Sequence, residues 1–186
     1  MTLTPKNSGW IEVICGSMFS GKTEELIRRV RRAEIAKMNT IIFKPNIDNR
    51  YSSNHIVSHN QSKMKSVVVN DINEIIDLSK EMDVIGIDEA QFFSDDLVKV
   101  SKTLAKENKR VVVAGLDTDF RGKPFGSMPA LMCESDYLDK LRAICVKCGN
   151  PASFSQRLIK DLEQVLIGET DVYEARCRNC FNIEED

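Results

Sequence analysis

The segment WIEVICGSMFSGKT, residues Trp10 to Thr23, decides the fold. Trp10 to Cys15 reads as a short strand, and the following residues, Gly16 to Thr23, fit the pattern G-x-x-x-x-G-K-[ST]. A helical pattern then runs from Gly21 to Lys37. Its expected apolar stripe is Leu26, Ile27, Val30, Ala33 and Ile35. A strand, a glycine-bearing turn and a helix in this order predict a phosphate-binding loop (P-loop) at the start of an α/β domain.

The chemistry of this loop explains its spacing. Glycines let the backbone curl so that N–H groups point at phosphate oxygens, and the helix dipole adds partial positive charge at the same place. Lys22 would reach the β and γ phosphates of ATP, and the Thr23 hydroxyl would ligate Mg²⁺. A chance match in a glycine-containing turn is the alternative, and the flanking strand and helix argue against it. The predicted phosphate contacts are Gly16, Ser17, Met18, Phe19, Ser20, Gly21, Lys22 and Thr23.

Two adjacent carboxylates follow another apolar strand, Val84 to Ile87. Asp88 is the candidate second Mg²⁺ ligand, because P-loop sites need an acidic group at the end of a neighbouring strand. Adjacent residues in an extended strand project to opposite sides, so Glu89 would face a substrate hydroxyl as a general base. The same glutamate could instead polarise water for hydrolysis, and the residues alone fit both reactions.

The remaining chain alternates between strands and helices, which predicts a central parallel sheet. Helices are expected after Asp71 and after Ser94, and an irregular ligand-binding loop from Gly115 to Gly126. Lys44 to Lys65 reads as a polar surface loop, in which His55 and His59 receive no role. The further expected strands are Thr40 to Phe43, Met64 to Val69, Val111 to Ala114 and, last in the main sheet, Leu141 to Ile144.

Four of the six cysteines form two C-x-x-C pairs separated by 28 residues. This spacing is typical of a tetrahedral thiolate site around Zn²⁺, which would be structural because no coordination position stays open. Disulfides are the alternative, which a reducing cytosol disfavours. The predicted ligands are Cys145, Cys148, Cys177 and Cys180, while Cys15 and Cys133 are expected to be buried thiols. We therefore place a domain boundary at Cys145, with an ATP-binding domain at 1–144 and a zinc-binding lobe at 145–186.

The composition limits the class of protein. The 186 residues are 42% hydrophobic and 29% charged, with a formal net charge of −2, as in an ordinary globular protein. No concentrated basic segment indicates a nucleic-acid partner. The apolar runs are too short to cross a bilayer, and the N-terminal residues lack a secretory pattern. We expect a cytoplasmic protein with no membrane partner.

These motifs, in this order, resemble the type II thymidine kinases, the zinc-bearing cellular and bacterial family. The resemblance runs over nearly the whole chain. Besides the P-loop and the two cysteine pairs, the matching stretches are Asp48-x-Arg50-Tyr51, Asp88-Glu-Ala-Gln-Phe92, Asp117-x-x-Phe120 and Lys123-Pro-Phe-Gly126.

The resemblance implies a RecA-like P-loop domain with a parallel sheet, and a small C-terminal zinc lasso that closes over thymidine and reads its base largely through main-chain groups. Glu89 would take the proton of the 5′-hydroxyl, and Asp48 and Arg50 would lie near the phosphates and the metal. The implied pocket residues are Met18, Phe92, Leu116, Phe120, Phe125, Ser155, Leu166 and Tyr173. The family often has threonine where Ser155 stands. It also implies ATP and thymidine (and deoxyuridine) as substrates, dTMP as product in pyrimidine salvage, feedback inhibition by dTTP, and a homotetramer.

Two other functions compete with this interpretation. A nucleic-acid-stimulated P-loop ATPase with a zinc ribbon would explain both motifs, but such motors generally need two RecA-like domains and a basic track. A non-enzymatic nucleotide-dependent switch would explain the P-loop, but it has little need for a base at Glu89. Under the kinase interpretation, we expect removal of zinc to abolish nucleoside binding while ATP binding survives.

Overall fold

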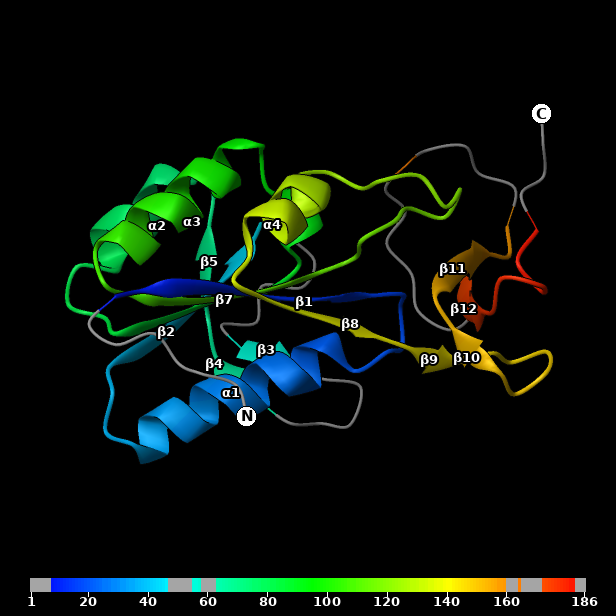
Figure 1. Ribbon diagram of the computed structural model, residues 1–186, viewed down its shortest axis with the longest axis horizontal. Coiled ribbons are helices and arrows are strands. Elements are labelled where there is room, and N and C mark those ends of the chain that lie inside the picture. The colour runs from blue at the N-terminus through cyan, green and yellow to red at the C-terminus, as the bar shows by residue number, and fades with distance from the viewer. Residues whose placement is uncertain (1–7, 47–54, 58–62, 160–163, 165–171, 183–186) are drawn as a thin grey trace.

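The computed structural model describes residues 8–46, 55–57, 63–159, 164 and 172–182. Its centre is a parallel sheet of six strands in the order β5-β2-β6-β7-β1-β8, shown in Figure 1. The six strands are β1 (Trp10–Gly16), β2 (Thr40–Pro45), β5 (Val67–Val69), β6 (Val84–Ile87), β7 (Arg110–Gly115) and β8 (Tyr137–Leu141). The helices are α1 (Lys22–Ile35), α2 (Asn73–Leu78), the 3-10 turn η2 (Ala90–Phe92), α3 (Asp96–Lys106) and α4 (Met128–Glu134). The expected α/β fold with a central parallel sheet is confirmed.

Helices cover the two faces of this sheet. Along β1, Val13 packs into the core beneath α2, α3 and α4, whereas its neighbour Ile14 packs against α1 on the other face. This alternation follows from the period of two in a strand. In Figure 1, α1 lies on one side of the sheet and the other helices lie on the opposite side. Both faces are therefore buried, as a parallel sheet requires.

The topology gathers the chemistry-bearing segments at one edge of the sheet. Because the strands are parallel, β1, β6 and β7 all end on the same side, at Gly16, Ile87 and Gly115. The P-loop, the Asp88–Glu89 pair and the loop from residue 116 to 127 follow these three ends directly. The crevice outside the carboxyl ends of such strands is where open α/β sheets bind ligands.

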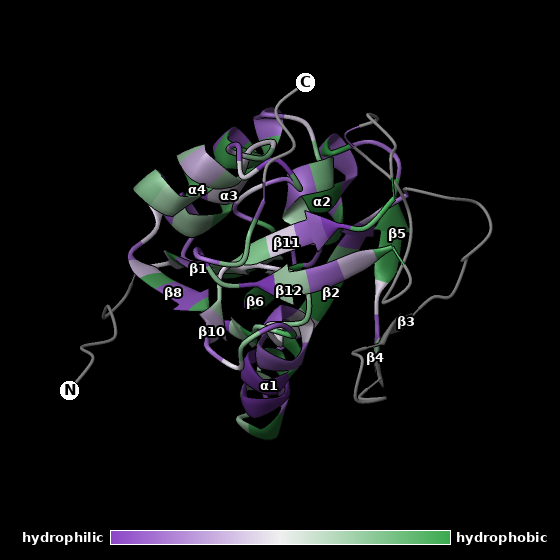
Figure 2. Ribbon diagram, turned by 90° about the vertical axis from the view of Figure 1, so that its right-hand side faces the viewer, coloured by the Kyte–Doolittle hydropathy of each residue, from purple (hydrophilic) through white to green (hydrophobic). Residues whose placement is uncertain are grey.

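A small C-terminal lobe follows the sheet at this same end of the molecule (Figure 1). It contains two antiparallel pairs: β9 (Ala143–Ile144) with β10 (Pro151–Ala152), and β11 (Phe154–Arg157) with β12 (Tyr173–Arg176). Figure 2 faces this lobe and shows β11 and β12 in front of the sheet. We call the described residues from β9 onward the C-terminal lobe.

Several sequence expectations on secondary structure were wrong. The last strand of the main sheet is Tyr137–Leu141 rather than Leu141 to Ile144, because Ala143–Ile144 pairs with β10 in the lobe. Within the supposed polar loop, β3 (His55–Val57) and β4 (Lys63–Lys65) form an antiparallel hairpin. Helix α4, which packs Met128 and Leu131 into the core, had not been expected.

Two side chains also depart from their expected burial. Ile35, the last residue of α1, is 73% exposed, whereas the other four residues of the expected stripe are buried. Cys15 is buried as expected, but Cys133 lies on the outer side of α4 and is exposed. Among the helices in the described ranges, none has the length and apolarity that crossing a membrane would need.

Candidate active site

The P-loop has the curled backbone that its glycines predicted. Gly16 and Gly21 have φ values of 142° and 85°, and a Cβ on Gly16 would lie 2.4 Å from the carbonyl oxygen of Leu141. Gly16 therefore cannot be replaced without moving the backbone. The Lys22 ammonium folds back and donates a hydrogen bond to the carbonyl oxygen of Ser17 at 2.8 Å. The loop thus closes on itself with its lysine at the centre.

Asp88 meets the P-loop where the sequence predicted a Mg²⁺ site. Its two carboxylate oxygens lie 3.2 and 3.4 Å from the Thr23 hydroxyl oxygen, and Asp88 is almost fully buried. Burial, followed by the negative charge of Glu89, raises the pKa of Asp88 to about 7. Burial also lowers the pKa of Lys22, although the nearby carboxylates of Glu89 and Asp88 oppose that shift. A buried carboxylate beside a hydroxyl fits a hard divalent cation, which would keep it ionised.

Glu89 stands at a strained position beside this pair. Its φ of 53° puts a non-glycine residue in the left-handed region, which costs energy and is typical of functional sites. Gln91 holds the side chain by donating a hydrogen bond from Nε2 to Glu89 Oε2 at 2.7 Å. The other end of the same amide, Oε1, accepts a hydrogen bond from the backbone N–H of Leu116 at 2.9 Å. The carboxylate of Glu89 is therefore oriented by a buried amide anchored to the end of β7.

Gln91 orients the candidate base, a role that the sequence analysis did not predict. The available signal was a polar side chain between Ala90 and Phe92, two apolar residues directly after the predicted base. Buried amides need partners for both ends, so such a residue indicates a hydrogen-bond relay.

The loop after β7 brings aromatic rings towards this edge. Phe92 and Phe125 meet edge to face, with ring centroids 5.5 Å apart. Asp119 holds the loop in shape, because its Oδ1 accepts hydrogen bonds from the backbone N–H groups of Arg121 at 2.9 Å and Lys123 at 3.0 Å. The predicted wall residues Phe92, on η2, and Phe125, on the loop after β7, thus lie together.

Arg157 connects the two other predicted aromatic residues. Its guanidinium carbon lies 3.6 Å from the centre of the Phe120 ring, and it donates a hydrogen bond to the Tyr173 hydroxyl at 2.7 Å. A second hydrogen bond from the same nitrogen reaches the carbonyl oxygen of Gln164 at 3.2 Å. Arg157 is 7% exposed and was not predicted. A buried arginine on a lobe strand joins the loop after β7 to the lobe.

The P-loop itself also touches the lobe. The backbone N–H of Met18 donates a hydrogen bond to the Ser155 hydroxyl oxygen at 2.9 Å. The Ser17 hydroxyl lies 3.4 Å from the carbonyl oxygen of Ala152, its acceptor. Phe19 packs against the buried cluster of the lobe. Three consecutive P-loop residues are therefore in contact with lobe residues.

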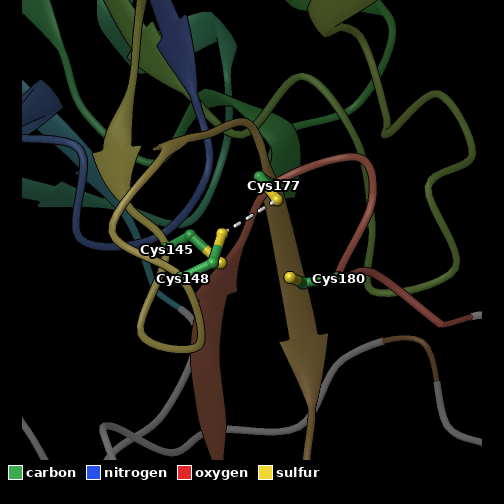
Figure 3. A group of neighbouring side chains, drawn as sticks. All are labelled: Cys145, Cys148, Cys177 and Cys180. Atoms are coloured by element: carbon green, nitrogen blue, oxygen red, sulfur yellow. Dashed lines mark hydrogen bonds between the residues drawn. The ribbon is translucent and has the colours of Figure 1, made fainter.

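The four predicted cysteine ligands converge. Their sulfur atoms all lie within 4.8 Å of one another, and Figure 3 shows them approaching from two segments. Cys148 Sγ and Cys177 Sγ are 3.5 Å apart, too far for a disulfide and near the ~3.8 Å of two thiolates on a tetrahedral zinc ion. Hydrogen bonds with Cys148 and Cys177, reinforced by burial, raise the pKa of Cys180 to about 12. Because four thiolates need a cation between them, the donor set fits structural Zn²⁺.

Three predicted site residues cannot be placed. Asp48, Arg50 and Leu166 lie outside the described residues. All other predicted site residues lie at the carboxyl edge of the sheet, in the P-loop or in the lobe.

Several solved structures are similar to this chain at low identity. AMPPCP-bound DnaA from Aquifex aeolicus matches with a TM-score of 0.46 and 20% identity, over 74% of this chain and 42% of that chain. A replication initiator DnaA bound to AMPPCP and single-stranded DNA gives 0.46 and 20%, over 71% and 40%. Domain III of the Thermotoga maritima replication initiation protein DnaA gives 0.45 and 14%, over 72% and 55%. The chain thus spans between 40% and 55% of the length of these structures.

The match to a protein family covers nearly the whole chain. A family model described as thymidine kinase matches residues 9–181. The match includes the P-loop, the Asp88–Glu89 pair, the loop from residue 116 to 127 (the aromatic loop) and the four clustered cysteines. The chain therefore belongs to the thymidine kinase family.

Proposed function

We propose that this chain transfers the γ-phosphoryl group of ATP to the 5′-hydroxyl of thymidine, and of deoxyuridine, to give the 5′-monophosphate in pyrimidine salvage. Family membership supports a kinase acting on thymidine. The observation that carries the rest is the position of Glu89, a carboxylate fixed by Gln91 beside Lys22 and Asp88. A base next to a phosphate-binding loop is what transfer to an alcohol requires.

The residues divide the reaction between them. Glu89 accepts the proton of the 5′-hydroxyl as the oxygen forms its bond to the γ-phosphorus, while the bond from that phosphorus to the β–γ bridging oxygen breaks and ADP leaves. Lys22 and the backbone N–H groups of the P-loop balance the negative charge on the phosphates. Thr23 and Asp88 would hold Mg²⁺, which would supply positive charge against the phosphates. Asp48 and Arg50 complete the proposed phosphate site.

The proposed nucleoside pocket lies between the loop after β7 and the lobe. Thymidine carries no charge, which suits a wall of aromatic and apolar side chains. Phe120 and Tyr173 come from the two sides of this space and are joined through Arg157. The proposed wall comprises Met18, Phe92, Leu116, Phe120, Phe125, Ser155, Leu166 and Tyr173.

The lobe supplies the lid in this proposal. Residues 145–186 form a unit that Zn²⁺ holds together and that covers the nucleoside, with the domain boundary at Cys145. The resemblance further suggests a homotetramer that dTTP inhibits. From the composition and charge we also propose a cytoplasmic protein that needs no nucleic acid.

A nucleoside panel tests the substrate. Purified, zinc-replete protein is incubated with ATP and Mg²⁺, and 5′-monophosphate formation is followed for each nucleoside. We expect product from thymidine and deoxyuridine and none from deoxycytidine or purine nucleosides. If no nucleoside is phosphorylated, the proposed substrate is wrong.

The same preparation separates the kinase from the alternative ATPase. ADP release is measured with single-stranded DNA or RNA in place of nucleoside. Strong stimulation by nucleic acid, with none by thymidine, would favour the nucleic-acid-stimulated P-loop ATPase with a zinc ribbon.

A further inference from the structure

We propose that Ser155, supported by the packing of Phe19, is a positioning residue for the P-loop, through which the C-terminal lobe sets the affinity for nucleotide as well as for nucleoside. This inference rests on the proposed function, because it assumes that the P-loop binds ATP. It gives the Ser155 hydroxyl a task separate from that of lining the base pocket.

The first observation is the hydrogen bond from the Met18 N–H to the Ser155 hydroxyl oxygen, 2.9 Å long. Ser155 is only 3% exposed, so water has little access to compete for this contact. Met18 lies in the middle of the loop whose N–H groups must face the phosphates. A hydrogen bond that takes up one of these N–H groups from outside fixes which way the neighbouring peptide units point.

The second observation is the conformation of Phe19. Its φ of 63° lies in the left-handed region, which costs a non-glycine residue of order 1 kcal/mol or more. Its ring packs against the buried cluster of the lobe, formed by Ala143, Cys145, Ala152, Ala175 and Cys177. Burial of the ring there offsets the backbone cost, so the lobe stabilises a loop conformation that the loop would not hold alone.

The third observation is that the same lobe residues adjoin the cysteine site. Ala152, whose carbonyl oxygen faces the Ser17 hydroxyl at 3.4 Å, belongs to the cluster that also contains Cys145 and Cys177. A lobe held together at its cysteines therefore presents Ala152, Ser155 and the cluster to the P-loop as one surface. When that surface loosens, the fraction of molecules with a binding-competent P-loop falls, and the apparent dissociation constant rises in inverse proportion.

The test measures nucleotide affinity without nucleoside. Binding of a β,γ-methylene analogue of ATP, with Mg²⁺, is followed by calorimetry for the wild type and for Ser155→Ala. We expect roughly three- to tenfold weaker binding, the effect of losing one hydrogen bond that orders the loop. Ser155→Thr keeps the hydroxyl and should restore most of the affinity. Ser101→Ala is the matched control, because Ser101 is a fully buried serine on α3, away from the P-loop.

The outcomes separate this inference from the proposed function. If Ser155→Ala binds the analogue as the wild type does, and changes only the preference between thymidine and deoxyuridine, Ser155 serves the base pocket alone and the inference is wrong. If the wild type does not bind the analogue at all, the proposed function fails and the inference fails with it. Zinc content is measured in each variant, so that a general loss of the lobe is recognised.

A second measurement needs no variant. By reciprocity, a nucleotide that favours the supported P-loop must also stabilise the lobe. Hydrogen exchange at the amides of β11 in the wild type should therefore slow when the ATP analogue is added without thymidine. Unchanged exchange in β11, under conditions where calorimetry shows the analogue bound, would overturn the inference even if Ser155→Ala fails to fold.

Discussion

The parallel sheet and the C-terminal lobe are stabilised in different ways. The sheet buries large apolar side chains on both faces, such as Phe43, Leu97 and Ile14. Among the described residues of the lobe, the buried cluster consists of alanines and cysteines: Ala143, Cys145, Ala152, Ala175 and Cys177. Because hydrophobic stabilisation scales with buried apolar area, burial can stabilise the sheet, whereas we expect the lobe to depend on the metal that its four cysteines could hold.

The sheet region and the lobe also have different roles in the proposed reaction. The groups that carry out chemistry in the proposed reaction are Lys22, at the start of α1, and Asp88 and Glu89, directly after β6, so all three belong to the sheet region. The lobe holds no such group in the proposed reaction, but it contacts the P-loop through Ser155 and the aromatic loop through Arg157. We therefore expect changes to the sheet to affect turnover and changes to the lobe to affect binding.

The largest effect should come from Cys177→Ser. Loss of one thiolate opens the tetrahedral site, and structural zinc contributes about 10–16 kcal/mol to small zinc domains. We expect loss of bound zinc, rapid amide exchange in β11 and β12, and thymidine affinity lowered by more than roughly a hundredfold, since the lid would no longer form. Atomic absorption, hydrogen exchange and calorimetry measure the three quantities, while the thermal unfolding of the sheet should persist.

The matched control is Cys133→Ser, because Cys133 is exposed on α4 and outside the cluster. Unchanged thymidine affinity in zinc-free Cys177→Ser protein would show that the lobe is not a lid. The structure changes the expected effect of zinc removal on ATP affinity. From sequence, zinc removal was predicted to spare ATP binding, whereas the contacts of Ser155 and Phe19 now predict that ATP affinity falls to a smaller extent than thymidine affinity.

The second effect concerns the sheet. Glu89→Gln should lower kcat by roughly 10²–10⁴ while thymidine and ATP affinities stay near those of the wild type. The shape is conserved, and Gln91 can still donate its hydrogen bond to the new amide oxygen. Steady-state kinetics with calorimetry measure the two quantities. Glu107→Gln, at an exposed position after α3, is the control, and undiminished turnover in Glu89→Gln would remove Glu89 from the mechanism.

The third effect returns to the lobe. Arg157→Lys keeps the charge but loses the planar group that stacks on Phe120 and reaches the Tyr173 hydroxyl. We expect the KM for thymidine to rise roughly tenfold with little change in kcat. The pocket walls lose their connection through Arg157, whereas the proposed general base Glu89 is untouched. Arg178→Lys, a lobe arginine near the Phe154 ring, is the control. If kcat instead fell by the same factor as kcat/KM, Arg157 would act on the transition state itself.

Sequence and structure agree best where local pattern and fold coincide. The P-loop, the Thr23–Asp88 pair and the four cysteines were predicted, because each depends on a spacing that a short segment or a parallel sheet enforces. Gln91 and Arg157 were missed, since their roles arise from contacts between segments distant in sequence, such as the hydrogen bond from the Leu116 N–H to Gln91. Tertiary pairing of this kind leaves no local period.

The end of the main sheet shows the same limit. Leu141 to Ile144 is apolar enough for a strand, but which sheet it joins depends on pairing with distant residues. Tyr137–Leu141 pairs with β1, and after Arg142 the chain turns into the lobe, where Ala143 faces Ala152. Composition alone therefore predicted the wrong bounds for the last strand of the main sheet. The proposed boundary at Cys145 remains a prediction, with the finding that β9 already belongs to the small lobe sheet.

The smallest expected effect concerns the surface ion pairs of α1, the helix that packs on one face of the sheet. Glu25 on α1 accepts hydrogen bonds from Arg28 and Arg29, and the Arg28 hydrogen bond is the main cause that lowers the pKa of Glu25 from 4.5 to about 2. A carboxyl whose folded pKa is depressed stabilises the fold above its unfolded pKa, and this contribution is lost as pH falls from about 4.5 to 2. Glu25→Gln should therefore lower the free energy of unfolding at pH 7 and make no difference below pH 2.

The size of this effect should stay below about 1 kcal/mol, because Arg28 is largely exposed and water and salt screen the pair. Urea unfolding of the wild type and Glu25→Gln between pH 2 and pH 7, with exposed Glu81→Gln as control, measures it. A loss of several kcal/mol would contradict the view that apolar burial stabilises the sheet region. It would mean that α1 is held to the sheet by its ion pairs rather than by the burial of Leu26 and Val30.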